Sequence, residues 1–125
     1  TDMYELLHGA ATDRLHEGPL DIHDSVALTV VLASEGYPAS PIKGRTIDGL
    51  SEVLAGEAYG RAWVNFAGVA LGDDGQYIAS GGRVLSCTAQ SDDLTSAHDA
   101  AYELLEQLAL EGAHHRRDIG HRAME

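Results

Sequence analysis

Two short segments contain the residues whose types could bind a ligand. Ser80-Gly81-Gly82-Arg83 combines two glycines, which let a backbone approach a ligand closely, with an arginine whose forked donors suit phosphate or carboxylate. Gly36-Tyr37-Pro38 is the second, with the composition of a turn. Each pattern taken alone also fits a tight turn, with the arginine solvated or bonded to a local carboxylate such as Asp73 or Asp74. On pattern alone, the turn is favoured.

Motifs for several other chemistries are missing from the sequence. It contains no phosphate-binding P-loop, no Gly-x-Gly-x-x-Gly, no Gly-x-Ser-x-Gly and no Cys-x-x-Cys. His114, His115 and His121 match no standard zinc spacing, and adjacent histidines point in different directions, so we predict no metal site. Cys87 falls in a predicted strand and is expected to be a small buried side chain. We therefore predict no catalytic residue in this chain.

The charge balance limits the kinds of partner. Among 125 residues, 20 are acidic and 8 basic, giving a net charge of −12, which disfavours nucleic acid and anionic membranes. Three arginines, Arg116, Arg117 and Arg122, lie within the last ten positions and could serve a small anion. One cysteine, no secretory signal at the start and no long apolar run predict a cytoplasmic protein with no membrane segment.

Helical periodicity predicts two helices around a set of strands. Apolar residues at helical spacing predict a helix over residues 2–15. A second helix is predicted from an N-cap at Asp92 or Asp93 to Leu110, with Gly112 at the position after its end. Residues 25–33 are almost continuously apolar and β-branched, which predicts a strand buried on both faces.

The middle of the chain is predicted to form antiparallel strands. They cover residues 45–47 (a weak candidate), 62–70, 76–79 and 83–89, and the second and third of them form a hairpin. The order of helix, strands, long helix and short tail predicts an α+β fold, in which a small antiparallel sheet is covered by one long helix.

Two segments of the chain stand out when the short motifs are taken together: Ala33-Ser34-Glu35-Gly36-Tyr37-Pro38, and Gly81-Gly82-Arg83-Val84-Leu85 with Thr88-Ala89. They are similar to the Ala-Ser-x-Gly-Tyr-Pro loop and the Gly-Gly-Arg-Val-Leu-x-x-Thr-Ala segment of the phosphoribosylamine–glycine ligase family, and the resemblance covers essentially the whole chain. The other matching segments are Lys43-Gly44, Ile47-Asp48-Gly49-Leu50, Ala67-Gly68, Ala101-Tyr102, Glu111-Gly112 and residues 116–123.

The resemblance implies a fold and a reaction. It implies that residues 1–18 are the terminal helix of an ATP-grasp domain, and residues 19–125 a C-terminal α+β domain with a small sheet or half-barrel. The family uses ATP to join glycine to phosphoribosylamine through an acyl phosphate. ATP and Mg²⁺ are bound by the preceding ATP-grasp domains, so this chain alone is expected to be inactive and to bind neither. Expected substrate-binding residues are Gly36, Tyr37, Pro38, Gly81, Gly82 and Arg83.

Some positions depart from the family pattern. Phe66 stands where the family has histidine and Val69 where it has threonine, while Ser80 and Arg117 replace other polar residues. Such changes leave two alternatives to the ligase. One is a non-catalytic module that binds a phosphorylated metabolite or a protein, and the other is a domain that only stabilises its parent enzyme.

Overall fold

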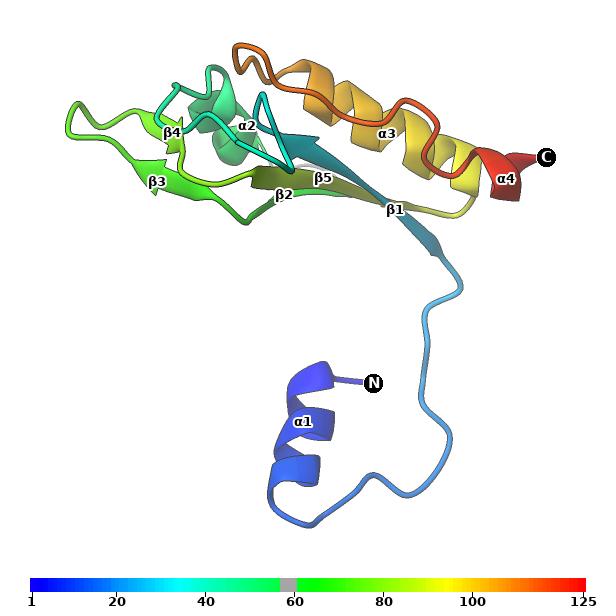
Figure 1. Cartoon of the computed structure of the whole chain (residues 1–125). Coiled ribbons are helices and arrows are strands. Elements are labelled where there is room, and N and C mark those ends of the chain that lie inside the picture. Colours follow the sequence, from blue (N-terminus) through cyan, green and yellow to red (C-terminus); the bar gives the residue numbers. More distant parts are fainter. Residues whose placement is uncertain (57–60) are drawn as a thin grey trace.

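The computed structural model describes residues 1–56 and 61–125 and shows an α+β domain, as predicted (Figure 1). The elements are α1 (Met3–Ala11), β1 (Val26–Ala33), α2 (Leu50–Gly56), β2 (Ala62–Phe66), β3 (Val69–Leu71), β4 (Tyr77–Ala79), β5 (Arg83–Ser91), α3 (Leu94–Glu106) and α4 (His121–Met124). None of the described helices is both long enough and apolar enough to span a bilayer.

The sheet is antiparallel and has two parts. β5 lies in the centre of a three-stranded sheet of order β1-β5-β2, and β3 pairs with β4 in a separate hairpin. α3 covers one face of the three-stranded sheet (Figure 1). The core between them is made of small and aliphatic side chains: Leu28, Val30, Leu32, Val84, Leu85, Cys87, Ala89, Ala97, Ala101, Leu104 and Leu105, joined by Leu50 and Val53 of α2.

β1 is buried on one face only, so the prediction of a strand buried on both faces is wrong. Leu28, Val30 and Leu32 point into the core, whereas Thr29 is exposed and Val31 is 43 % exposed. α3 supplies a helical layer on one side of the sheet alone. On the opposite side the hydroxyls of Thr29 and Thr88 share a hydrogen bond of 2.8 Å. The apolar side chains on the second face of β1 are therefore left exposed in the described structure.

α3 begins as predicted and ends earlier than predicted. Asp93 is its N-cap, and its carboxylate accepts from the N–H of Ser96 at 2.9 Å. The helix ends at Glu106 instead of Leu110, because Ala109 leaves the helical path and exchanges two backbone hydrogen bonds with Asp48.

Gly112 is therefore not the residue that follows the helix end. Its φ of +70° belongs to a later turn. A β-carbon there would collide with the Arg45–Glu35 ion pair, whose guanidinium also donates to the Glu111 carbonyl. The hydrogen bond to Glu35 raises the pKa of Arg45 above its ordinary value. The absence of a side chain at Gly112 thus leaves space for the Arg45 guanidinium to bind both Glu35 and the Glu111 carbonyl.

The predicted strand over residues 62–70 is two strands with a bulge between them. The N–H groups of Ala67 and Gly68 both donate to the carbonyl of Val84, at 3.0 and 2.8 Å. In this bulge two residues lie opposite a single residue of β5, and the chain leaves the sheet here and enters the β3–β4 hairpin. The weak strand candidate at residues 45–47 is reduced to one bridge, between Thr46 and Ile78. The helices α2 and α4 were not predicted.

α1 stands apart from the rest of the molecule (Figure 1). Its helix ends at Ala11, short of the predicted residue 15, and none of its residues is buried. Met3, Leu7 and Leu15 are each more than 60 % exposed. An extended stretch without a helix or strand leads from α1 to β1. The division into residues 1–18 and 19–125 remains a prediction.

Candidate functional site

The two segments singled out in the sequence lie side by side. A hollow of about 510 Å³ is lined by Tyr37, Pro38, Pro41, Ala67, Gly68, Ser80, Gly81, Gly82 and Arg83. We call it the Tyr37–Arg83 hollow. It lies where the loop after β1, the bulge after β2 and the turn before β5 meet. Of the six predicted substrate-binding residues, five line it, and Gly36 does not.

Ser34 fastens the two segments to each other. Its hydroxyl donates to the carbonyl of Gly81 at 2.9 Å, and its backbone N–H donates to the carbonyl of Gly82 at 2.8 Å. The residue is 2 % exposed, so water does not compete for these bonds. Sequence reasoning had included Ser34 in the family-like loop without giving it a role.

The glycines of the hollow are needed for close packing. A β-carbon on Gly82 would lie 2.6 Å from the ring of Tyr37, and one on Gly68 would lie 2.7 Å from the backbone of Gly81. Neither glycine has a positive φ, so steric approach is what requires them. The aromatic ring and the two backbones consequently form one closely packed wall of the hollow.

Gly36 shapes the loop from outside the hollow. Its φ is +83°, and a β-carbon would collide with the carbonyl of Ser40. Its own carbonyl accepts from the N–H of Ser40 at 2.8 Å. Gly36 therefore closes the turn that carries Tyr37 and Pro38, which are joined by a cis peptide bond.

Arg83 is the charged residue of the Tyr37–Arg83 hollow. It is exposed, and within residues 1–56 and 61–125 no side chain forms an ion pair or hydrogen bond with it, including Asp73 and Asp74. By contrast, Arg45, Arg61 and Arg116 each bind a carboxylate. No aspartate or glutamate among the described residues lines the hollow, although the chain has 20 acidic residues. Arg83, which has no counter-charge among those residues, is therefore available to an anion.

Phe66, which departs from the family pattern, lies just before the bulge. Its ring makes an edge contact with Tyr77, with 5.8 Å between ring centroids, and it remains 50 % exposed. Phe66 precedes Ala67, which lines the hollow.

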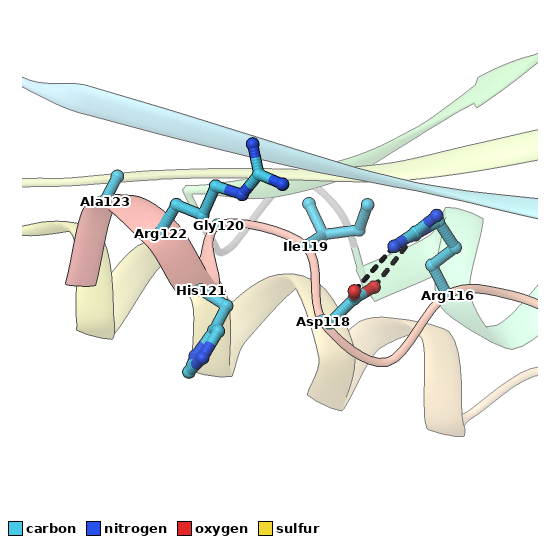
Figure 2. A pocket seen from close by; sticks show the side chains of 7 residues that line it. All are labelled: Arg116, Asp118, Ile119, Gly120, His121, Arg122 and Ala123. Atoms are coloured by element: carbon cyan, nitrogen blue, oxygen red, sulfur yellow. Dashed lines mark hydrogen bonds and ion pairs between the residues drawn. The ribbon is translucent and has the colours of Figure 1, made fainter. Parts of the chain in front are cut away.

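A second hollow, the tail hollow, lies along residues 116–123 and has a volume of about 380 Å³. Figure 2 shows Arg116 bound to Asp118 through two hydrogen bonds, and His121 pointing away from Arg122. These bonds raise the pKa of Arg116 and lower that of Asp118 from their ordinary values. The phenol of Tyr102 donates to the Arg116 carbonyl at 2.6 Å and fixes the segment on α3.

The three histidines near the C-terminus make different contacts. His114 forms a backbone bridge with Ala33, the ring of His115 lies 6.0 Å from that of Tyr102, and His121 contacts Glu125. Among the described residues, no three or more His, Cys, Asp or Glu side chains form a group that could hold a metal ion. Cys87 is fully buried in β5, as the sequence predicted.

Comparison with known proteins identifies one family. Residues 27–122 match the family described as phosphoribosylglycinamide synthetase, C domain. The chain is 46 % identical over 122 residues to a phosphoribosylamine–glycine ligase of Mycobacterium tuberculosis, covering 97 % of this chain and 27 % of that protein. It is 39 % identical to the trifunctional purine biosynthetic protein adenosine-3 of Gallus gallus, covering 99 % of this chain and 12 % of that protein.

A solved structure gives the same result. The crystal structure of phosphoribosylamine–glycine ligase from Thermotoga maritima superimposes with a TM-score of 0.75 at 33 % identity, covering 92 % of this chain and 26 % of that one. The chain therefore spans about a quarter of the length of the bacterial relatives it matches.

Proposed function

The chain belongs to the phosphoribosylglycinamide synthetase C-domain family, and we propose that it supplies one wall of the active site of a phosphoribosylamine–glycine ligase. In that reaction a phosphoryl group is transferred from ATP to the carboxylate of glycine, which gives an acyl phosphate and releases ADP. The amine of phosphoribosylamine then attacks the acyl carbon, and glycinamide ribonucleotide forms as phosphate leaves. This is a step of purine biosynthesis, and we propose the cytoplasm as its location.

The chemistry divides between this chain and preceding domains. Residues 1–56 and 61–125 offer no carboxylate cluster that fits Mg²⁺, so we assign the nucleotide and Mg²⁺ to preceding ATP-grasp domains. ATP and Mg²⁺ supply the phosphoryl group and neutralise its charge. The role proposed for this chain is to orient a substrate anion and to keep water from the acyl phosphate.

The observation that carries this proposal is the Tyr37–Arg83 hollow. Two loops far apart in the sequence meet in it, and both resemble loops of the ligase family. Arg83, which has no carboxylate partner in the described residues, fits the phosphate of phosphoribosylamine or the carboxylate of glycine. The apolar wall of Tyr37, Pro38 and Pro41 would exclude water from the same space.

A chimera tests the proposal. This chain replaces the matching 122-residue segment of the Mycobacterium tuberculosis relative, and glycine-dependent release of ADP is measured with phosphoribosylamine present. We expect ligase turnover within about tenfold of that of the parent enzyme, since the chains are 46 % identical. A folded chimera that binds ATP without forming product would contradict the proposal and favour a non-catalytic binding module.

A further inference from the structure

The backbone at Gly81 and Gly82 has two donors with nothing bound to them. Both carbonyls accept hydrogen bonds from Ser34, as described above. Within residues 1–56 and 61–125, neither the N–H of Gly81 nor that of Gly82 donates to a backbone or side-chain acceptor. Both residues line the Tyr37–Arg83 hollow. Both glycines are partly exposed, and two adjacent backbone donors without a partner in the described residues, in the same hollow as Arg83, are available to a ligand.

Ser34 determines the direction of one of these donors. The Gly81–Gly82 peptide bond is trans, so its carbonyl and its N–H point in opposite directions. Because the carbonyl of Gly81 points to the Ser34 hydroxyl, the N–H of Gly82 points away from Ser34. The bond between the Ser34 N–H and the Gly82 carbonyl holds the next peptide unit as well. That unit carries the N–H of Arg83, whereas the N–H of Gly81 belongs to the Ser80–Gly81 peptide, so Ser34 fixes the Gly82 donor of the pair. Successive N–H groups in a turn form anion-binding concavities in many proteins.

We infer that the N–H groups of Gly81 and Gly82, together with the Arg83 guanidinium, bind one oxyanion, a phosphate or a carboxylate, and that Ser34 is the positioning residue of this site. The electrostatics agree, because the part of the lining that the structure describes includes an arginine and no carboxylate. The anion site rests on this geometry, whereas its assignment to a ligase substrate rests on the proposed function. Phosphoribosylamine would supply the phosphate, and glycine the carboxylate.

Amide chemical shifts of the 125-residue chain test the inference. The ¹H–¹⁵N spectrum is recorded while inorganic phosphate or acetate replaces chloride at constant ionic strength. We expect saturable shifts of the Gly81 and Gly82 amides, with a dissociation constant on the order of 1–10 mM for one of the two anions. Gly72, whose N–H already donates to Gln76 at 2.8 Å, is the internal control and should not shift. Saturation by phosphate alone assigns a phosphoryl group, and saturation by acetate a carboxylate.

Variants separate positioning from stability. Ser34→Ala should weaken anion binding about tenfold, the factor that one hydrogen bond contributes. Thr88→Ala removes another buried hydroxyl, bonded to Thr29 and Asn65, and should lower the melting temperature without changing anion affinity. Where Ser34→Ala does not fold, Ser34→Cys, a similar-sized but weak donor, takes its place.

The results separate this inference from the proposed function. Absence of saturable shifts at Gly81 and Gly82 with both anions overturns the anion site, even if the chimera is an active ligase. Equal anion affinity of Ser34→Ala and the unchanged chain would show that Ser34 does not position the site. Anion binding by the chain, combined with an inactive chimera, keeps the site and removes only its assignment to the ligase.

Discussion

Gly82 lies against the ring of Tyr37, and its backbone conformation is one that other residues adopt easily. What excludes a side chain is the 2.6 Å that would separate a β-carbon from the ring. Gly68 is restricted in the same way by the backbone of Gly81. The sequence pattern of Gly81-Gly82 favours a tight turn, and the family resemblance predicts that the pair contacts a ligand. The structure gives Gly82 a packing role, and the ring it contacts lines the hollow.

Replacing Gly82 therefore tests how rigid that wall is. Gly82→Ala should lower the free energy of unfolding by about 1–3 kcal/mol, because the Tyr37 ring must move out of its packed position. Urea denaturation measures the change. Gly56→Ala is the control, since no described atom lies within 4 Å of a β-carbon there, and it should be neutral or slightly stabilising. Equal stability of Gly82→Ala and the unchanged chain would contradict the packing role.

Arg83 should act through its charge and its forked shape. In the chimera, Arg83→Ala is expected to lower kcat/KM about 10- to 100-fold, mainly by raising KM for phosphoribosylamine or glycine. Arg83→Lys keeps the charge without the two parallel donors, so its kcat/KM should lie between that of Arg83→Ala and that of the unchanged chimera. Arg61→Ala, at the far end of β2 and bound to Asp92, is the control and should leave the kinetics unchanged. Normal kinetics in Arg83→Ala with a lowered melting temperature would assign Arg83 to structure.

At the scale of elements, local sequence patterns predicted those features that interactions between neighbouring residues determine. The N-cap of α3, the central strand β5 and the β3–β4 hairpin follow from capping, alternation and turn residues. The predicted bounds are wrong where a contact with a distant segment determines the end of a helix or strand. α3 stops at Glu106 because Ala109 pairs with Asp48, and the strand after Ala62 breaks where Ala67 and Gly68 both bind Val84. No periodicity within a single segment contains this information.

The cap of α3 gives a prediction about pH. Hydrogen bonds from the Ser96 hydroxyl and N–H lower the pKa of Asp93 below its ordinary value of 3.8. A lowered folded-state pKa stabilises the fold above the unfolded-state value, and this contribution is lost as the pH falls through the folded-state pKa. Asp93→Ala should lower the melting temperature at neutral pH by roughly 4–8 °C.

Thermal unfolding at several pH values measures this effect. Asp93→Asn keeps an acceptor but does not titrate, so its difference from the unchanged chain should shrink when the pH falls below 3.8. Asp92→Ala is the control, because Asp92 forms an exposed pair with Arg61 and should matter little. A difference between Asp93→Asn and the unchanged chain that does not vary with pH would contradict the role of charge in the cap.

At the scale of the whole molecule, the site depends on contacts between segments that lie far apart in the sequence. The two glycine segments could be recognised individually, and their resemblance to one family suggested a common role. Their meeting in one hollow depends on β5 pairing with β1 on one side and β2 on the other. Ser34 was missed because its importance lies in two hydrogen bonds to residues nearly fifty positions away. A serine after a strand carries no sequence signal of such a bond.

The proposed division of labour predicts how the chain behaves toward nucleotide. The 125-residue chain should show no binding of Mg-ATP at micromolar concentrations in titration calorimetry, because it has no P-loop and its described residues offer no group for a metal. The chimera, which carries the preceding domains, is the positive control. Micromolar binding of Mg-ATP by the chain alone would overturn the assignment of the nucleotide to those domains.

α1 gives the last prediction, because its apolar face is exposed in the part of the chain that the structure describes. Met3 and Leu7 are each more than 60 % exposed, as is Leu15 in the segment that follows the helix, and no α1 residue is buried. We propose that a preceding domain covers this face. Removing residues 1–18 should then change the free energy of unfolding of the chain by less than about 0.5 kcal/mol. Leu50→Ala, at a fully buried position of α2, should cost about 2–5 kcal/mol and confirms that the assay is sensitive.

The chimera supplies the contrasting measurement for the same helix. There Leu7→Ala should lower stability by about 2–3 kcal/mol, because covering the face with a neighbouring domain removes the leucine from water. In the 125-residue chain the same substitution should have almost no effect, since Leu7 is 64 % exposed. Equal effects in both proteins would contradict a covering domain. A large loss of stability on removing residues 1–18 from the chain would instead show that α1 belongs to the domain that follows it.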